Sequence, residues 1–589
     1  MKSLMGHSLA WPADYNWYPV TEISNFPRQH VTNVSVFYPW FLSMWSMATA
    51  STSTTPPPSS LTIHSAENTD TTPRRFQTMA KPGPTNRWIA DSEDSPTRQR
   101  TRPLASSFPS TFEEVVSWKQ IDIEYPTKKA RDAAIKSGRF VAENNLPLGL
   151  HVFRSKIFVT LPKWKEGVPV TLGFVGRGQG RSPAIKPYPD WSWHGQSCDG
   201  LTSVFRIDVD VCNRLWVLDS GVVDAENTVR QMCPPQIFIF DLETDKLLHR
   251  YTLPRDQSPD SSLLSNIVVE VLPNTHNNND GDGGRHYRDT DTDTDSHSHG
   301  HSHSHTRSHT RSYSTNSDSD STSNFNHLPP RPAKSQHQRY NANRVNGYDC
   351  VDAYAYLGDV FRYGLIVYSY KTNRSWRVTH SYFYPDPLAS DYVLDGIEFQ
   401  WVDGLFGMAL SPLDSRAQRL LYFHPLSSYR EFAVPTHVLR NETLGFAMTK
   451  FFRIVGKPRG ESVSHSTGSG MSNNGILFYN LLTKAAVACW NSDLPYDPST
   501  QHVLYQDNVT MSFPNDLRVD LEPEQSVWVL SNRLHRFLYD RLDPNDVNFR
   551  ILSAPVNGVV RGTVCDQGAV YPGDEYKSQE SSSRYRDPW

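Results

Sequence analysis

The feature of this chain that most constrains its fold is a repeated sequence motif of short β-strands. A β-branched strand leads into a polar turn, and two strands rich in aromatic and branched residues follow, most clearly in SVFRIDVDVCNRLWVLDSG…QIFIFDL at 203–208, 214–219 and 236–241. Variants of the middle strand recur at 156–162, 353–359, 419–425, 475–481 and 526–532, which makes six in all. Because the spacing is roughly 50–70 residues once one insertion is removed, the pattern predicts an all-β, six-bladed β-propeller.

The strand order assigns these segments to six blades. Blade 1 takes 145–152 and 156–162, blade 2 takes 201–210, 214–220, 236–242 and 247–253, and blade 3 takes 267–272, 352–359, 364–370 and 376–382. Blade 4 takes 405–410, 419–425 and 430–438, blade 5 takes 475–481 and 485–490 with its first strand unassigned, and blade 6 takes 516–520, 526–532 and 548–553. The alternating segment 118–125 is expected to close the ring beside the C-terminal strands, which removes exposed sheet edges.

Composition divides the rest of the chain. Residues 1–50 form a leader in which the apolar run 34–47 precedes Ala48-Thr49-Ala50, a pattern that predicts a secretory signal ending near Ala50. The alternative is a stray apolar patch in a disordered leader, and the run is too short to predict a membrane span. Residues 51–111 are expected to be a disordered Ser/Thr/Pro-rich linker, 112–566 the propeller and 567–589 a polar tail.

One long insertion interrupts blade 3 between its first and second strands. Residues 274–346 contain NNNDGDGG, DTDTDTD and a histidine tract from His297 to His309, with almost no apolar side chains. Such a segment cannot bury enough surface to fold alone, so we expect it to be disordered. The histidines could bind zinc or copper, although a solvated low-complexity loop is the simpler interpretation.

Charge and motifs exclude several classes of function. The formal net charge is −4 with no basic stripe, which argues against nucleic acid as the main partner. The chain has no GxSxG, HExxH or P-loop pattern, so hydrolase, zinc-protease and nucleotide-binding roles lack support. No cofactor or metal is expected for the propeller.

The cysteines and sequons favour an extracellular protein. All six cysteines fall at strand ends or in turns, where disulfides pin loops. Cys198 and Cys233 precede the first and third strands of blade 2 and share one face. Cys212 and Cys350 occupy equivalent turns on the other face. Cys489 and Cys565 remain as the third pair, although six cysteines allow fifteen pairings. Candidate N-glycosylation sequons, which support secretion only weakly, begin at Asn373, Asn441 and Asn508.

Several long stretches resemble the yellow/major royal jelly protein family. They include ENNLPLGLHVFRSKIFVTLPKWKEGVPVTLGFV, MCPPQIFIFDLETDKLLHRYTLP, DAYAYLGDVFRYGLIVYSY, DGLFGMALSP, LYFHPLSS, ACWN, FPNDLRVD and NFRI, in this order over about 112–566 outside the insertion. The resemblance implies a secreted six-bladed propeller of insect type. It also implies links to cuticle pigmentation and melanin, egg coverings, food proteins or binding of biogenic amines, with dopachrome conversion in some members.

Function in a propeller is expected at one mouth of the central channel. Loops that enter the innermost strands and loops that join second to third strands share one face, which gives these candidates: Thr202, Asp219, Asn266, Asp403, Phe406, Phe513, Asn515 and Asp516. Together they supply what an aromatic amine needs, namely a carboxylate, a ring wall and a hydroxyl or amide. The alternative is that Asp219 and Asp516 only cap turns. No catalytic residue is assigned, and His194 is the nearest histidine to that face.

Four functions remain open at this point. The favoured prediction is a secreted propeller that binds small aromatic amines or catechol derivatives in cuticle pigmentation. The alternatives are a dopachrome-converting tautomerase and a structural protein of cuticle or eggshell matrix. A calcium-dependent lactonase-like propeller is a remote alternative, with Glu143, Asn515 and Asp516 as its ligands.

Overall fold

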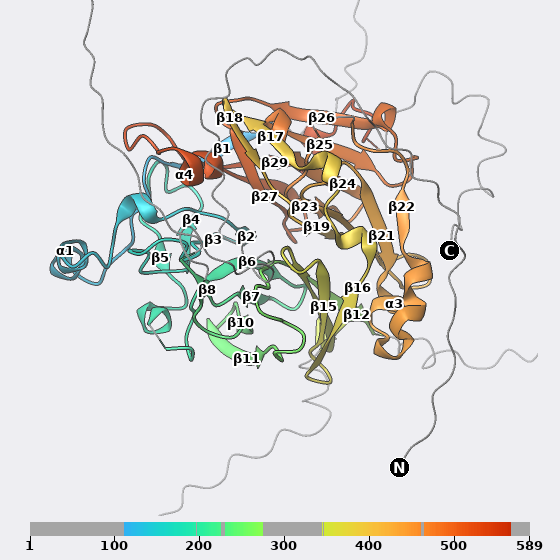
Figure 1. Ribbon diagram of the computed structural model, residues 1–589, viewed down its shortest axis with the longest axis horizontal. Coiled ribbons are helices and arrows are strands. Elements are labelled where there is room, and N and C mark those ends of the chain that lie inside the picture. The colour runs from blue at the N-terminus through green and yellow to red at the C-terminus, as the bar shows by residue number, and fades with distance from the viewer. Residues whose placement is uncertain are drawn as a thin grey trace, which may run out of the picture. The chain divides into compact units, whose positions relative to one another are not determined.

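The computed structural model describes residues 111–195, 197–224, 230–274, 344–345, 347–460 and 464–566. All of them belong to the second of two units into which the chain divides, 100–589; the first, 1–99, lies outside the described residues. The described residues form six antiparallel sheets arranged around a common centre (Figure 1). The prediction of an all-β, six-bladed propeller is confirmed.

The first three blades each contain four main strands, numbered outward from the centre. Blade 1 consists of β2 (Leu150–Phe153), β3 (Lys156–Thr160), β4 (Leu172–Gly176) and β5 (Lys186–Pro187). Blade 2 consists of β6 (Val204–Val209), β7 (Arg214–Asp219), β10 (Gln236–Asp241) and β11 (Lys246–Thr252). Blade 3 consists of β12 (Leu264–Pro273), β14 (Tyr348–Asp359), β15 (Gly364–Ser369) and β16 (Arg374–Thr379), and β13 (Arg344–Val345) pairs with β14.

The last three blades follow the same plan. Blade 4 consists of β19 (Leu405–Leu410), β20 (Leu420–Pro425), β21 (Glu431–Pro435) and β22 (Arg453–Val455). Blade 5 consists of β23 (Ser469–Met471), β24 (Ile476–Leu481), β25 (Ala486–Asn491) and β26 (Gln501–Gln506). Blade 6 consists of β27 (Phe513–Val519), β28 (Ser526–Asn532), β29 (Phe549–Pro555) and, as its outermost strand, β1 (Glu113–Trp118).

Contacts between the innermost strands close the ring. Each of β6, β12, β19, β23 and β27 packs against the next, and β2 packs against both β6 and β27. The sheet of blade 6 combines both ends of the propeller, because β1 pairs with β29. The sequence placed this closing strand at 118–125, which is wrong. Ile121 and Ile123 are buried beside blade 1, where Ile123 makes an isolated bridge to Ile185, so they alternate like a strand without joining the ladder.

A buried aspartate–tryptophan pair recurs at the far end of two inner strands. Asp210 follows β6 and accepts a hydrogen bond from the indole of Trp216 at 2.7 Å, and Asp520 follows β27 and accepts one from Trp528 at 2.8 Å. Both carboxylates also accept backbone N–H groups of the following turn. The repeated motif in the sequence therefore encodes a turn in which the side chain of an aspartate links the inner strand to the second strand by hydrogen bonds.

Helices and extra hairpins lie between the strands. The α-helices are α1 (Lys128–Lys136), α3 (Thr436–Leu439), α4 (Leu534–Tyr539) and α5 (Val556–Val559). The 3-10 helices are η1 (Ala142–Asn144), η2 (Trp191–His194), η3 (Ser381–Phe383), η4 (Pro387–Ala389), η5 (Glu442–Phe451), η6 (Leu482–Lys484) and η7 (Pro498–Thr500). Two small hairpins pair β8 (Val222–Val223) with β9 (Arg230–Gln231) and β17 (Asp391–Leu394) with β18 (Ile397–Gln400). No helix among the described ranges is long and apolar enough to cross a membrane.

Three disulfides join the loops. The structure pairs Cys198 with Cys233, Cys212 with Cys350, and Cys489 with Cys565, the same three pairs that the strand order favoured. The second bridge links the turn between β6 and β7 of blade 2 to strand β14 of blade 3. The third ties β25 to the segment after α5, near the end of the described chain.

Several expectations concern residues that the structure does not describe. The leader at 1–50, almost all of the linker at 51–111 and the tail at 567–589 lie outside the described residues. The expected insertion at 274–346, with its histidine tract, lies outside them too, apart from Asn274 and the short strand β13.

Candidate functional site

Four of the six innermost strands are interrupted by a bulge near the end where they begin. The register with the second strand skips one residue each in β6, β12, β19 and β27, and the skipped residues are Phe205, Ser265, Phe406 and Asn515. A bulge leaves one residue unpaired and re-aims its side chain, and bulges are common next to functional sites. The fold therefore builds a ring of re-aimed side chains at one mouth of the channel.

Three blades have a glycine at the position equivalent to the residue that follows the bulge. Gly149, Gly407 and Gly468 occupy this position in blades 1, 4 and 5. A Cβ on Gly468 would lie 2.5 Å from the backbone nitrogen of Leu517, and one on Gly407 would meet the ring of His424 at 2.1 Å. The other three blades carry large polar residues at the equivalent position: Arg206, Asn266 and Asp516.

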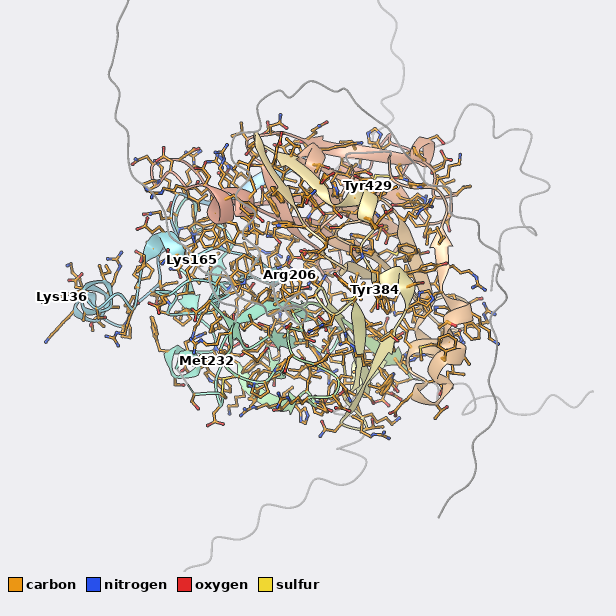
Figure 2. The ribbon with its side chains drawn as sticks, in the orientation of Figure 1. Lys136, Lys165, Arg206, Met232, Tyr384 and Tyr429 are labelled. Atoms are coloured by element: carbon orange, nitrogen blue, oxygen red, sulfur yellow. A yellow bond between two sulfur atoms is a disulfide. The ribbon has the colours of Figure 1, made fainter. Side chains whose placement is uncertain are left out.

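Arg206 occupies the centre of the ring (Figure 2). Its guanidinium donates to the Asn515 side-chain oxygen at 2.6 Å and to the Asn515 carbonyl at 3.2 Å, and it lies 5.6 Å from the centre of the Phe406 ring. These partners come from blades 6 and 4, neither of which neighbours blade 2. Arg206 therefore reaches the channel axis, where only 1% of its surface is exposed and burial lowers the pKa of its guanidinium.

A chain of charged groups continues from Arg206 along the axis. Asp516 lies 3.3 Å from Nε of Arg206 and 3.7 Å from Nε of Arg518. Arg518 lies 3.9 Å from Asp208, which in turn lies 3.2 Å from the imidazole of His151. We call these five residues the axial network. Its two arginines and two aspartates balance in formal charge.

Four of the residues expected at the mouth meet at this network. Asn266 donates to the Phe406 carbonyl at 2.6 Å and accepts from Arg518 at 3.1 Å. Asp516 accepts the backbone N–H of Leu150 at 2.9 Å, which satisfies an edge group of blade 1. Asn266, Phe406, Asn515 and Asp516 thus lie together, whereas the other four are not part of this network.

Asp219 and Thr202 lie in a turn of blade 2. The Asp219 carboxylate accepts backbone N–H groups of Thr202 at 2.5 Å, Ser203 at 2.8 Å and Gly221 at 2.9 Å. Burial raises the pKa of Asp219, and the three hydrogen bonds oppose that effect. In this structure the Asp219 carboxylate shapes the turn, as the alternative interpretation held.

Asp403 is the carboxyl group best placed to meet a ligand. It is half-buried and lies three residues before Phe406, a stretch of chain that spans at most about 10 Å. Among the described residues, no donor bonds its carboxylate, although its backbone is fixed to Ser427 by two hydrogen bonds. Burial without a compensating donor raises its pKa from 3.8 to about 7. The carboxyl can therefore hold or release a proton near neutral pH.

Apolar side chains surround the mouth. The fully buried Phe205, Phe513 and Trp401 belong to one apolar cluster, against which Trp164 and Phe406 pack half-buried. The ring of Phe513 stacks on the ring of His535, with their centres 5.8 Å apart. Because Phe513 is buried, its ring supports the side chains at the mouth from inside the protein. Large rings of this kind suit a flat aromatic ligand.

The β17–β18 hairpin lies over this cluster. Its tip residue Asp395 accepts from Ser512 at 2.7 Å and from His535 at 3.0 Å, both near blade 6. Tyr392 on its inner face stacks on His465 at 4.0 Å, near blade 5. The hairpin precedes blade 4, so it spans three blades on the face that carries Asp403.

The opposite mouth of the channel contains a cavity of about 160 Å³. His151, Asp208 and Arg518 form part of its lining, together with the far ends of five inner strands. Asp208 is engaged with His151, with Arg518 and with the backbone N–H of Val269 at 2.7 Å. The axial network therefore lies between this cavity and the mouth that carries Asp403.

Sequence reasoning missed the axial arginines, Asp208, His151 and the bulged Phe205 and Ser265. The signal lay in FRIDVD and NDLRVD, where charged residues interrupt strands that are otherwise apolar. A charge in a strand usually faces solvent, and only closure of the ring brings these side chains together.

Two other residues named in the sequence analysis, His194 and Glu143, lie outside the axial network. His194 is buried in η2, bonds the Tyr188 carbonyl at 3.1 Å and has its pKa lowered to about 3 by burial, so it stays neutral. Glu143 lies on η1, and the described residues contain no group of three or more histidine, cysteine or acidic side chains that could hold a metal ion. Asn515 and Asp516 contact arginines, which disfavours a calcium site there.

Comparison with known proteins identifies the family. The sequence profile of "Major royal jelly protein" matches residues 202–281 and 320–565. A Drosophila melanogaster protein named dopaminechrome tautomerase is 38% identical over 474 residues, which cover 78% of this chain and 86% of that protein. Protein yellow of the same species is 36% identical over 461 residues, or 77% of this chain and 71% of the relative.

A solved structure that matches the fold is more distant in sequence. The virginiamycin B lyase from Staphylococcus aureus matches with a TM-score of 0.30 and 9% identity, covering 66% of this chain and 78% of that one. That likeness is too low to bear on function, whereas the family profile and the two insect relatives span most of the propeller. The chain belongs to the major royal jelly protein family, which includes protein yellow.

Proposed function

We propose that this chain binds a small aromatic amine or catechol derivative at the mouth of the channel that carries Asp403 and Phe406. The observation that carries the proposal is the meeting of the Phe406 ring with buried hydrogen-bonding groups at the axis. The half-buried carboxyl of Asp403 lies three residues away along the chain, and no donor from the described part of the chain bonds it. The ring suits an aromatic ligand, and the carboxylate suits its ammonium group.

Tautomerisation of a catechol-derived quinone is the second candidate, and Asp403 favours it. A tautomerase moves a proton from carbon to oxygen of the same molecule, so the reaction needs a base and an acid but no redox partner. A carboxyl with a pKa of about 7 can take the proton from carbon, and the resulting acid or water can return one to oxygen. The 38% identical relative bears the name dopaminechrome tautomerase, which supports this candidate.

Calorimetric titration with dopamine and serotonin tests binding. We expect saturable binding that weakens up to about fivefold in Asp403→Asn, because an ion pair worth up to about 1 kcal/mol is lost. Phe406→Leu should also weaken binding, whereas the matched Phe446→Leu should not, since Phe446 is 89% exposed on the outside of blade 4. Equal effects of both phenylalanine substitutions, or no heat with the native protein, would contradict the proposal.

A dopaminechrome-decay assay on the same variants tests turnover. If Asp403 is the base, decay should accelerate in the native protein as pH rises through 7, since the base must be ionised. Asp403→Asn should abolish the acceleration. Binding without accelerated dopaminechrome decay would indicate that the protein binds the ligand and does not convert it.

We further propose that the protein is secreted and acts in cuticle pigmentation. Three disulfides support an oxidising compartment, and the relatives named yellow and dopaminechrome tautomerase support a place in pigment chemistry. Detection of the protein in the culture medium of insect cells would test secretion. Retention of all of it inside the cells would contradict it.

A further inference from the structure

A second cavity, with a volume of about 520 Å³, lies between blades 4 and 5. The segments that bound it follow the far ends of strands: 411–420 follows β19, 473–475 follows β23, and Asp493 follows β25. Because β19 begins just after Asp403, this cavity lies on the face of the propeller opposite the mouth that carries Asp403. Its volume falls within the range of about 300–1,000 Å³ that is typical of small-molecule sites.

The hydroxyl of Tyr422 is the most deeply placed polar group of this cavity. Tyr422 lies on β20 and lines the cavity, and only 7% of its surface is exposed. Its ring packs edge-on against Trp490, with the ring centres 5.8 Å apart, whereas its hydroxyl bonds no group among the described residues. The hydroxyl can be hydrogen-bonded only through the cavity. A ligand that fills the cavity must therefore bring its own hydrogen-bonding group to Tyr422.

Donors and acceptors surround this hydroxyl. Burial, Glu431 and Asp493 raise the pKa of Tyr422, so its hydroxyl stays protonated and can both donate and accept. Asp493 is exposed, and no donor in the described part of the chain bonds its carboxylate. The half-buried Arg419 has more N–H donors than the two hydrogen bonds that it makes with described residues. The cavity can therefore both accept hydrogen bonds from a ligand and donate hydrogen bonds to it.

The charges that line the cavity balance. Two carboxylates, Asp414 and Asp493, accompany two guanidiniums, Arg416 and Arg419. His437 is neutral at neutral pH, because burial and neighbouring arginines lower its pKa. An ionic ligand group would meet like charges as well as opposite ones, whereas a neutral ligand avoids the repulsion. The lining thus favours a neutral molecule that carries several groups able to donate and to accept.

Apolar side chains supply the rest of the lining, namely Pro412, Leu413, Leu420 and Pro435. A pyranose sugar combines a face of C–H groups, which suits such a surface, with a rim of hydroxyls that each donate and accept. We propose that the cavity between blades 4 and 5 is a second binding site, that it takes a neutral sugar, and that the Tyr422 hydroxyl bonds a hydroxyl of that sugar. This inference does not rest on the function proposed above. A sugar held there leaves the mouth at Asp403 open.

A ligand-observed NMR titration of the full chain with glucose, galactose, mannose and N-acetylglucosamine tests the inference. We expect saturable binding in the millimolar range. Tyr422→Phe should weaken this binding about fivefold, the effect of one hydrogen bond between uncharged groups, and should leave the melting temperature unchanged. Asp493→Ala, at an exposed position, should weaken binding at least as much, because a charged acceptor forms a stronger hydrogen bond. Tyr384→Phe, at a position that is 54% exposed, is the matched control and should change neither quantity.

A further titration distinguishes the source of the sugar. If the β-1,4-linked trimer of the best-bound sugar binds more tightly than the single sugar, the site takes a polysaccharide chain. Equal affinity would identify a free sugar or a chain end, and either result supports the inference.

Other outcomes would overturn it. The inference is wrong if none of the four sugars binds, or if either cavity variant binds sugar as tightly as the native protein. A lowered melting temperature of Tyr422→Phe would mean that the fold itself uses the hydroxyl, which removes the premise. Excess dopamine should not displace the sugar, and displacement would move the sugar to the mouth and refute a second site. Failure of the native protein to bind dopamine would contradict only the function proposed above.

Discussion

Replacing Asp403 with asparagine should stabilise the protein, and the gain should depend on pH in a defined way. Burial raises the pKa of Asp403 from 3.8 to about 7 in the folded state. Between these values the folded state holds a proton that the unfolded state has released, so folding becomes less favourable as pH rises. The stability contribution of Asp403 is complete below pH 4 and is lost by the time pH passes 7.

The size of the stability gain in Asp403→Asn follows from the pKa shift of Asp403. A difference of about three pKa units corresponds to about 4 kcal/mol at 1.36 kcal/mol per unit, and this is an upper bound because Asp403 is partly exposed to water. Asparagine has nearly the same shape and cannot ionise. The gain from Asp403→Asn should be near zero below pH 4, grow by at most about 1.4 kcal/mol per pH unit up to pH 7, and stay constant above it.

Urea unfolding of the native protein and the variant at half-unit steps from pH 5 to 8.5 measures this difference. Phe446→Leu, at a position that is 89% exposed, serves as a control whose effect should not vary with pH. A difference that is flat from pH 5 to 7, or one that shrinks as pH rises, would refute a raised pKa at Asp403. The acid–base role proposed for this carboxyl would then lose its physical basis.

Three further results are expected elsewhere in the molecule. Asp516→Ala should destabilise the fold by about 3–5 kcal/mol in urea unfolding, because Arg206 and Arg518 would remain buried without their shared carboxylate. Replacing both Cys489 and Cys565 with serine should cost about 4 kcal/mol, since that bridge closes a loop with a sequence separation of 76 residues; no change in the urea midpoint would contradict it. In insect cells, each of the exposed sequon residues Asn373, Asn441 and Asn508 should carry a glycan, and an unchanged mass after deglycosylation would count against secretion.

Most strands could be predicted because their side chains follow a clear pattern. The strands at 405–410 and 526–532 lie where the sequence placed them, since their apolar residues pack between neighbouring blades. The inner strand of blade 5 had no such pattern. It is Ser469–Met471, within STGSGM, and it contains small residues because blade 6 approaches closely: a Cβ on Gly470 would lie 3.1 Å from the backbone nitrogen of Val519.

The candidate site was predictable only in part, and the reason is geometric. Asn266, Phe406, Asn515 and Asp516 could be placed at the mouth because loop positions in a propeller are fixed by strand order. Arg206 contacts blades 4 and 6 across the axis, at sequence separations that no local pattern reveals. The bulges shift the register by one residue, and local alternation carries little information about that shift.

The residues at the mouth fall into two groups, one that stabilises the fold and one that can change without loss of the fold. Arg206, Asp516 and Arg518 tie inner strands together across the channel, so substitutions there change the fold along with any binding. Asp403 and Phe406 are half-buried and contribute little to these ties between strands, because no donor among the described residues bonds the Asp403 carboxylate and Phe406 contributes mainly its ring. Affinity and chemistry can therefore change at these two positions while the propeller persists. Relatives with this floor but different residues at 403 and 406 should bind different aromatic ligands with similar stability, which parallel calorimetry and urea unfolding of Asp403→Asn and Phe406→Leu would measure.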